Sequence, residues 1–205
     1  MAEGDRSPRE RMVFSAVQLI RREGVTSTSM RDVVEHARAP RGSLQHYFPG
    51  GKEQLVNEAV EWAARFASGR IDRFLAGMRR PTPSKLFSAM AGQWVEEFES
   101  AGFGAGCPLA AATIDCADST ASTRTAIASG FACWQRPVGQ ALIGLGVPAR
   151  KAASLAVLMI SALEGAILLA RAQQDTAPLR TVVRELGPLL DDSVQSGAAV
   201  RDHVR

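Results

Sequence analysis

Residues 28–55 of the chain, TSMRDVVEHARAPRGSLQHYFPGGKEQL, predict a short helix, a tight turn, a second short helix and the start of a third. Ser29 can cap the first short helix, and Asp32 follows three residues later, as in a capping box. The apolar residues of this helix recur at helical spacing and predict one buried side: Met30, Val33, Val34 and Ala37. The helix should stop before Pro40, because a proline ring disfavours helical geometry in the residue before it.

The second short helix, expected from about Arg41 to Phe48, has one side suited to reading DNA. Leu44 and Phe48 lie four residues apart and are expected to face inward together. The opposite side carries a guanidinium, a bare backbone, an amide and an imidazole, from Arg41, Gly42, Gln45 and His46. Arginine can form two hydrogen bonds with guanine, glutamine can do so with adenine, and glycine lets the backbone come close. We therefore expect this side to enter the major groove of DNA.

Polar residues around this helix are candidates for contacts with the phosphate backbone. They lie at the cap of the first helix, beside the outward side of the second and at the N-terminus of the third: Thr28, Ser29, Ser43, Tyr47 and Lys52. Hydroxyl and ammonium groups at such positions donate to phosphate oxygens. The alternative is a solvated helical hairpin with ordinary surface polar groups, which the combined arrangement disfavours.

This stretch resembles the DNA-binding part of the TetR family of transcriptional regulators. The resemblance covers about a quarter of the chain and lies in the caps at Thr28 and Ser29, in Arg-Asp-Val-Val at 31–34, and in Gly42-Ser43-Leu44 followed by His46-Tyr47-Phe48-Pro49 and Lys52. Two positions depart from the family. Arg38 stands in the turn where glycine is usual, so a left-handed turn there would be strained, although Arg38 could add a phosphate contact. Gln45 stands where an aromatic residue is common, so the preferred bases cannot be taken from relatives.

Composition and charge agree with this interpretation. The chain is 46% apolar but only 6% aromatic, and its many Ala and Leu residues favour an all-α fold. Residues 1–52 hold nine Lys or Arg against six Asp or Glu, whereas residues 53–205 hold fifteen of each. The net charge of +3 thus lies at the end expected to meet DNA.

We expect two domains: a three-helix helix-turn-helix DNA-binding domain at residues 1–52 and a ligand-binding and dimerisation bundle at residues 53–205. A single long helix from Lys52 to about Met78 should join them and act as a lever. Further helices are predicted over residues 7–24, 84–100, 108–116, 119–145 and 148–170, and from about 178 onward. Pro137 should kink or split its helix, and Gly187-Pro188 should kink the last helix or end it early.

The helices at 148–170 and 178–190 are more apolar than one bundle of this size needs. Small residues on the first would let a second helix approach closely, so we expect the pair to meet its copy in a four-helix homodimer interface. The candidate interface residues are Ser161, Gly165, Ala166, Leu169, Val182 and Leu186. The resemblance implies the same arrangement. The alternative is that both helices are simply buried within one subunit.

A second apolar set is rich in aromatic residues. It comprises Trp62, Phe66, Met90, Trp94, Phe98, Phe103, Leu109, Phe131, Trp134 and Met159. In most helical proteins such residues only form the core. Here the resemblance places them around a cavity for a lipophilic or aromatic effector. Gly106-Cys107-Pro108-Leu109 is also similar to the C-terminal type of the branch that includes lincomycin-resistance repressors.

Other classes of protein have less support. The three histidines and three cysteines form no catalytic or metal-binding pattern, so we expect no enzyme, no cofactor and no metal. The cysteines are interpreted as small core residues, with redox or ligand-reactive roles as the alternative. The start lacks an apolar signal segment, and Glu164 interrupts the apolar stretch 152–170, so we expect a cytoplasmic protein without a membrane span.

The sequence therefore predicts a homodimeric transcriptional regulator, and a repressor is the favoured type. Its two recognition helices should lie about 34–36 Å apart and enter successive major grooves of a palindromic DNA operator. A small effector in the C-terminal bundle would move the lever helix and lower the affinity for DNA. The alternatives are an activator, a regulator without a ligand, or a carrier of lipophilic ligands without DNA function.

Overall fold

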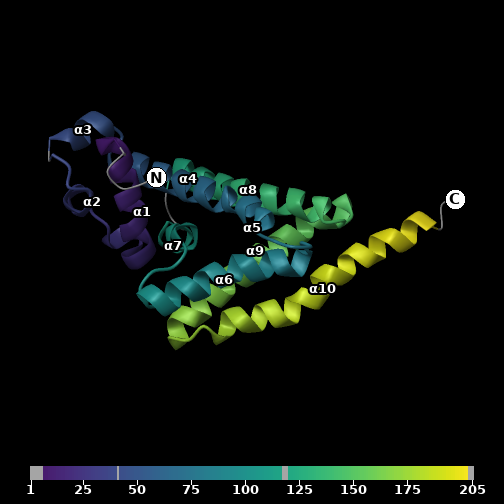
Figure 1. The fold of residues 1–205 in the computed structure, drawn as a ribbon. Coiled ribbons are helices and arrows are strands. Elements are labelled where there is room, and N and C mark those ends of the chain that lie inside the picture. The colour runs from purple at the N-terminus through teal and green to yellow at the C-terminus, as the bar shows by residue number, and fades with distance from the viewer. Residues whose placement is uncertain (1–6, 41, 117–119, 203–205) are drawn as a thin grey trace. The chain divides into compact units, whose positions relative to one another are not determined.

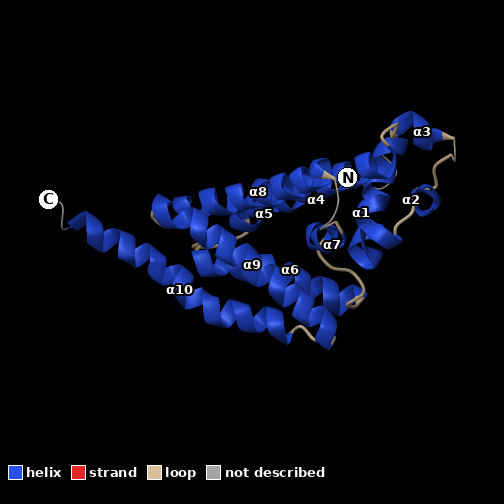
Figure 2. Cartoon of the chain, turned by 180° about the vertical axis from the view of Figure 1, so that it is seen from behind, coloured by secondary structure: helices blue, strands red, loops and turns tan. Residues whose placement is uncertain are grey.

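The computed structural model describes residues 7–40, 42–116 and 120–202, with side chains as far as Val194, and these residues are helical or in turns and loops (Figures 1 and 2). This confirms the predicted all-α fold. The contacts within the chain define two compact units. Unit 1 comprises residues 1–66 and 105–132, and unit 2 comprises residues 67–104 and 133–205. The functional boundary expected at residue 52 stays a prediction.

Unit 1 contains the N-terminal helices and a segment from much later in the chain. Its helices are α1 (Pro8–Ser27), α2 (Met30–His36), α3 (Ser43–Tyr47), α4 (Gly51–Ser68), α7 (Pro108–Asp115) and the first half of α8 (Ala121–Gly144). Both predicted capping boxes are present, at Ser7 with Glu10 and at Ser29 with Asp32. Apolar side chains from α1, α2 and α4 are buried at its centre: Met12, Ala16, Ile20, Val33, Val34, Leu55 and Ala59.

The helix expected from Lys52 to Met78 is divided in the structure. α4 (Gly51–Ser68) ends one residue before Gly69, and α5 (Arg70–Ala76) begins one residue after it. Glycine and serine are weak helix formers in a helix interior, which explains why the interruption falls at Ser68-Gly69. The structure therefore corrects the predicted bounds.

Unit 2 is a helical bundle. It contains α5, α6 (Pro83–Ala101), the second half of α8, α9 (Ala149–Gln173) and α10 (Ala177–Asp202). α6 and α9 lie beside α10 in both views (Figures 1 and 2). The Ser84 backbone N–H and hydroxyl donate to the Asp191 carboxylate at 2.9 and 2.6 Å, which ties the start of α6 to α10. Apolar side chains fill the core: Phe87, Met90, Met159, Leu163, Ile167, Leu179 and Leu190.

Two prolines lie inside helices without dividing them. Pro137 is within α8, and Pro188 is within α10, which continues to Asp202. Of the two alternatives expected at each proline, the split at Pro137 and the early end at Gly187-Pro188 are not found, and a kink at each stays a prediction. A proline removes only one backbone hydrogen bond, and packing on both sides of it can hold a helix together.

Among the described helices, α9 is long and apolar enough to cross a membrane by length and composition alone, with a mean hydropathy of 2.1. The helix is 44% buried inside the protein over that window, and the core helices of globular proteins meet the same criterion. We interpret α9 as a helix that packs on one side within unit 2.

Arg38 has a left-handed backbone, with φ of 49°, which is the conformation that the sequence indicated would be strained for arginine in this turn. This conformation costs a non-glycine residue about 1–2 kcal/mol. We predict that Arg38→Gly will be more stable to urea unfolding than Arg38→Ala by about 1 kcal/mol, since only glycine relieves the strain and part of the gain is offset by its freer unfolded chain. Both variants lose the guanidinium, so equal midpoints and slopes for the two would show that the turn is not strained.

Candidate DNA-binding interface

The start of α2 is held by reciprocal hydrogen bonds. The Ser29 hydroxyl accepts from the Asp32 backbone N–H at 3.2 Å and donates to the Asp32 carboxylate at 2.6 Å, and the Ser29 N–H donates to the same carboxylate at 3.0 Å. The bonds from Ser29 lower the pKa of Asp32, and the positive charges of Arg31 and Lys52 lower it further. Because the folded pKa is depressed, this cap stabilises α2 at neutral pH and is lost as the pH falls through that pKa.

The turn between α2 and α3 is closed by backbone hydrogen bonds. The Ala39 N–H donates to the Val34 carbonyl at 3.0 Å, and the Ser43 N–H donates to the Pro40 carbonyl at 3.0 Å. The Nε of Arg11 donates to the Ala37 carbonyl at 3.3 Å, so α1 also supports the end of α2. Together these bonds set the direction in which α3 leaves the turn.

One aromatic side chain anchors α3. Phe48 is 1% exposed, while Leu44 is half-buried. The guanidinium of Arg9 lies over the Phe48 ring at 5.3 Å and bonds Glu58 of α4 at 2.6 Å. With this side held against α1 and α4, the opposite side of α3 faces away from the unit.

The predicted base-reading residues described by the structure lie on that outer side. Gly42, Gln45 and His46 are exposed, and the His46 ring meets the half-buried Tyr47 ring edge-on at 5.0 Å. Arg41, the fourth predicted base-reading residue, lies outside the described residues. The geometry thus brings an amide, an imidazole and an open glycine to one surface, as a major-groove reader requires.

The predicted phosphate-contacting residues differ in their exposure and in whether their hydroxyls are already hydrogen-bonded within the chain. Ser29 and Arg38 are exposed, but the Ser43 hydroxyl donates to the Pro40 carbonyl. Thr28 is 4% exposed, and its hydroxyl donates to the Gly24 carbonyl at 2.7 Å. In this structure the hydroxyls of Thr28 and Ser43 therefore donate to backbone carbonyls of unit 1.

Two positively charged residues, Lys52 and Arg31, lie near the cap of α2. The Lys52 ammonium donates to the Thr26 carbonyl at 3.3 Å, and both residues act electrostatically on Asp32. Arg31 is exposed. Arg31 is not among the phosphate-contacting residues predicted from the sequence, although a basic residue in the first turn of α2 is a signal for such a contact.

Support for α1 comes from α7 and the segment just before it, far away in the chain. The Gly106 N–H donates to the Arg21 carbonyl at 2.8 Å, and the Arg21 Nε donates to the Gly106 carbonyl at 3.1 Å. The Asp115 carboxylate accepts from the Thr26 N–H at 3.1 Å. A side chain at Gly24, where φ is 82°, would overlap that carboxylate. No local pattern in the sequence could have revealed these partners.

The ten predicted effector-contacting residues fall into two sets. Trp62, Phe66, Leu109 and Phe131 belong to unit 1, whereas Met90, Trp94, Phe98, Phe103, Trp134 and Met159 belong to unit 2. In unit 1 the Trp62 ring stacks on Phe66 at 5.3 Å. In unit 2 the Phe98 ring lies 5.8 Å from Trp94 and 4.9 Å from Phe103. Their role in ligand binding stays a prediction.

The three cysteines, which all lie in the described part of the chain, are not joined in disulfides. Cys107 and Cys116 are buried and Cys133 is half-buried. Burial raises the pKa of the Cys116 thiol, and the nearby Asp115 charge raises it further, which lowers its reactivity at neutral pH. Among the described residues, no group of three or more His, Cys, Asp or Glu is arranged to hold a metal ion.

A capped helix, a closed turn and a short helix with an exposed polar side define a helix-turn-helix DNA-binding protein. Residues 15–59 match the family model described as bacterial regulatory proteins, tetR family. Residues 83–185 match the model for the C-terminal domain of LmrA/YxaF-like transcriptional regulators. The chain therefore belongs to the TetR family of transcriptional regulators, which confirms both the resemblance and its branch and makes the protein a regulator, not an enzyme.

Known proteins resemble the chain over most of its length. The HTH-type transcriptional regulator Rv0196 of Mycobacterium tuberculosis is 42% identical over 188 residues, covering 89% of this chain and 94% of the relative. The HTH-type transcriptional regulator LmrA of Bacillus subtilis is 25% identical, covering 87% and 93%. A TetR regulator from Legionella pneumophila has the same fold, with a TM-score of 0.78, 19% identity and coverage of 90% and 98%.

Gln45 and Lys52 should affect DNA binding differently. We predict that Gln45→Ala will relax base preference at one operator position, with a loss of about 1–3 kcal/mol on the preferred site only. Lys52→Ala should weaken binding to specific and random DNA alike. It should also reduce the slope of log affinity against log salt concentration by about 1. Fluorescence anisotropy at several salt concentrations measures both effects, and Ser129→Ala on the exposed side of α8 serves as a surface control. Equal losses on both DNAs for both variants would contradict these roles.

Proposed function

We propose that the protein is a homodimeric repressor of the cytoplasm, which binds a palindromic DNA operator and releases it when a small lipophilic or aromatic effector binds. The observation that carries the proposal is the placement of Gln45 and His46 on the outside of α3, opposite the buried Phe48. An amide and an imidazole on the outer side of a short helix are suited to hydrogen bonds with base edges. The alternative roles as an activator or a ligand-independent regulator share this DNA-binding surface.

The outer side of α9 supports the dimer. Large apolar side chains on it are 41–53% exposed: Val157, Leu158, Leu168 and Leu169. Ser161 and Gly165 lie between them in the sequence, and a Cβ at Gly165 would meet nothing within 4 Å. An exposed apolar stripe with small residues at its centre suits close packing against a second helix.

The other predicted interface residues differ in how they are placed. Val182 and Leu186 of α10 are half-buried, so part of each side chain is open to a partner. Ala166 is 1% exposed within its own unit. We therefore propose that the interface is centred on Ser161, Gly165 and Leu169, while Ala166 packs inside the subunit.

A two-fold dimer presents two copies of α3 to DNA. Such a pair fits successive major grooves when the helices lie about 34–36 Å apart, and the two half-sites are then related by the same two-fold axis. The operator is therefore proposed to be palindromic. Phosphate contacts near Lys52 and Arg31 would hold each half of the dimer in register.

The effector is proposed to be lipophilic or aromatic because of the aromatic rings in the part of the chain that matches LmrA/YxaF-like C-terminal domains. Trp94 is 9% and Phe98 is 2% exposed. An effector that contacts these rings would favour release only if it bound the DNA-incompetent conformation more tightly. A coupling of about 1–3 kcal/mol is typical of such regulators.

A mobility-shift titration tests the proposal. The full-length protein is titrated against the DNA flanking its own gene and against random DNA of equal length, at two salt concentrations. We expect a specific complex of two chains per site that survives the higher salt better than the nonspecific complex. Addition of candidate lipophilic and aromatic compounds should dissociate it for at least one compound.

The outcomes separate the parts of the proposal. Equal affinity for flanking and random DNA would contradict operator binding near its own gene. A specific complex that no member of a broad compound panel dissociates would contradict effector release. Increased transcription from the flanking promoter in vitro on adding the protein would identify an activator.

Gly165→Leu tests the dimer. The substitution adds bulk on the outer side of α9 where its own chain leaves open space, so the monomer should keep its fold. We predict a shift towards monomer in sedimentation velocity, with at least a tenfold weaker dimer and a parallel loss of operator binding. Ala128→Leu on the exposed side of α8 is the matched control. An unchanged sedimentation profile for Gly165→Leu would place the interface elsewhere.

A further inference from the structure

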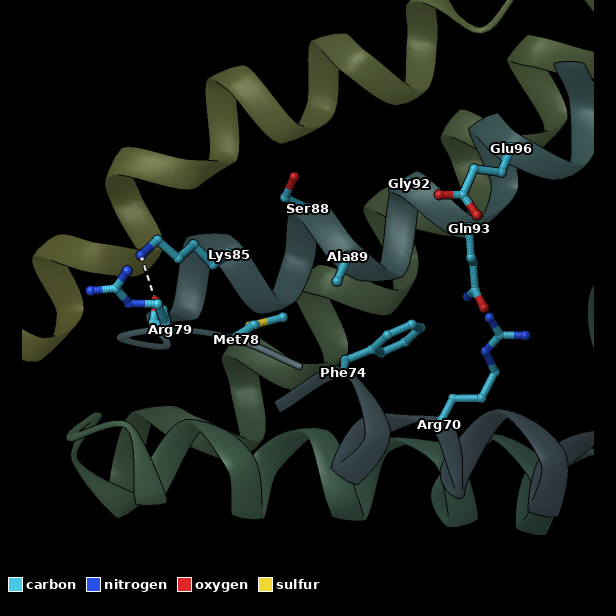
Figure 3. Close-up of a pocket in the computed structure, with 10 residues that line it drawn as sticks. All are labelled: Arg70, Phe74, Met78, Arg79, Lys85, Ser88, Ala89, Gly92, Gln93 and Glu96. Atoms are coloured by element: carbon cyan, nitrogen blue, oxygen red, sulfur yellow. Dashed lines mark hydrogen bonds between the residues drawn. The ribbon is translucent and has the colours of Figure 1, made fainter. Parts of the chain in front are cut away.

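A groove of about 540 Å³ lies between α5 and α6 in unit 2 (Figure 3). Its volume falls within the range of small-molecule sites. It includes none of the ten residues predicted to contact the effector, and the helix-turn-helix is not part of it. It is therefore a separate feature of the molecule.

The middle of the groove is apolar. Phe74 and Met78 approach it from α5 and the segment after it, and Ala89 approaches it from α6 (Figure 3). Gly92 of α6 borders the same space, and a Cβ there would meet nothing within 4 Å. The absence of a side chain at Gly92 thus leaves room over the apolar surface.

One end of the groove is cationic. Lys85 and Arg79 lie there together in Figure 3, while Glu96 lies at the other end. The Lys85 ammonium donates to the carbonyls of Arg79 and Arg80 at 3.4 and 2.8 Å, which holds its charge beside the opening. An ammonium held in this way retains one donor for a bound anion.

The opposite end is more nearly balanced in charge. The Arg70 guanidinium lies over the Phe74 ring at 5.4 Å. Its pKa is lowered, mainly by burial and then by Arg73, while Glu97 and Glu96 act in the opposite direction. Three cationic side chains and one carboxylate line the whole groove. The excess positive charge therefore lies at the end with Lys85 and Arg79.

We propose that this groove binds an amphipathic carboxylate, with its anionic group at Lys85 and Arg79 and its apolar body over Phe74 and Met78. The carboxylate forms charge-assisted hydrogen bonds with the two cations, and the body covers apolar surface next to Gly92. This site does not rest on the proposed effector release. It gives the regulator a second small-molecule site of a different chemical class.

Isothermal titration calorimetry with decanoate tests the site. The full-length protein, free of DNA, is titrated with decanoate below its micellar concentration, and with 1-decanol and decyltrimethylammonium as the uncharged and cationic counterparts. We expect decanoate to bind at least tenfold more tightly than decanol, and decyltrimethylammonium to bind least. 2-Naphthoate then distinguishes an aryl body from an acyl body. Equal binding of decanoate and decanol would overturn the proposal.

Three variants locate the bound molecule, two at Gly92 for its apolar body and one at Arg79 for its carboxylate. Gly92→Leu fills the open space and should weaken decanoate binding at least tenfold, whereas Gly92→Ala adds only a Cβ and should bind as the wild type does. Both replace a helical glycine by a better helix former, so neither should lower the thermal stability. Arg79→Gln should weaken decanoate binding about tenfold and leave decanol binding unchanged.

A further variant, Trp94→Leu, separates this site from the effector site. If Trp94→Leu abolishes decanoate binding while Gly92→Leu preserves it, decanoate occupies the aromatic cluster and the groove proposal fails, while the effector proposal gains support. If Gly92→Leu abolishes binding but decanoate never changes operator affinity, the groove proposal stands. A failure of any compound to release the operator bears only on the proposed function.

Discussion

Burial of the Phe48 ring determines which side of α3 faces outward. A five-residue helix is far too short to be stable alone, so its direction must come from the packing at its end. The ring is 1% exposed and lies under the Arg9 guanidinium, which Glu58 holds by an ion pair of 2.6 Å. Burying such a side chain contributes about 1.5–3 kcal/mol. The polar side chains of Gln45 and His46 would lose hydration by turning inward, so the two effects favour the same orientation.

The DNA-binding unit is assembled from two distant parts of the chain. α7 and the segment before it lie within the region that matches the LmrA/YxaF-like C-terminal domain, yet the Gly106 N–H donates to the Arg21 carbonyl of α1 and Asp115 of α7 accepts from the Thr26 N–H. Thr26 precedes the cap of α2 by three residues. A change in the position of α7 would therefore reach the start of the helix-turn-helix through hydrogen bonds within one compact unit. This is a direct physical route by which the C-terminal part of the sequence can act on DNA binding.

Unit 2 presents two surfaces with different chemistry. The outer side of α9 exposes large apolar side chains around small ones, and such a surface is stabilised by covering it with a similar surface from another copy. The groove between α5 and α6 combines an apolar middle with ammonium and guanidinium groups at one end. A second protein helix would leave those charges without partners, whereas a small amphipathic anion matches both parts. The apolar outer side of α9 is therefore suited to self-association, and the partly cationic groove is suited to binding a small molecule.

The local part of the structure was determined by the sequence alone. The cap formed by Ser29 and Asp32 joins residues three positions apart, and the polar and apolar sides of α3 follow from residue spacing, so spacing and residue type are sufficient to predict them. Tertiary structure decided the rest: the support of α1 by Asp115, the burial of Thr28, and the division of the aromatic residues between two units. Those contacts join residues as many as 89 positions apart. Which distant surfaces meet depends on the packing of whole helices, and no periodicity within one helix contains that information.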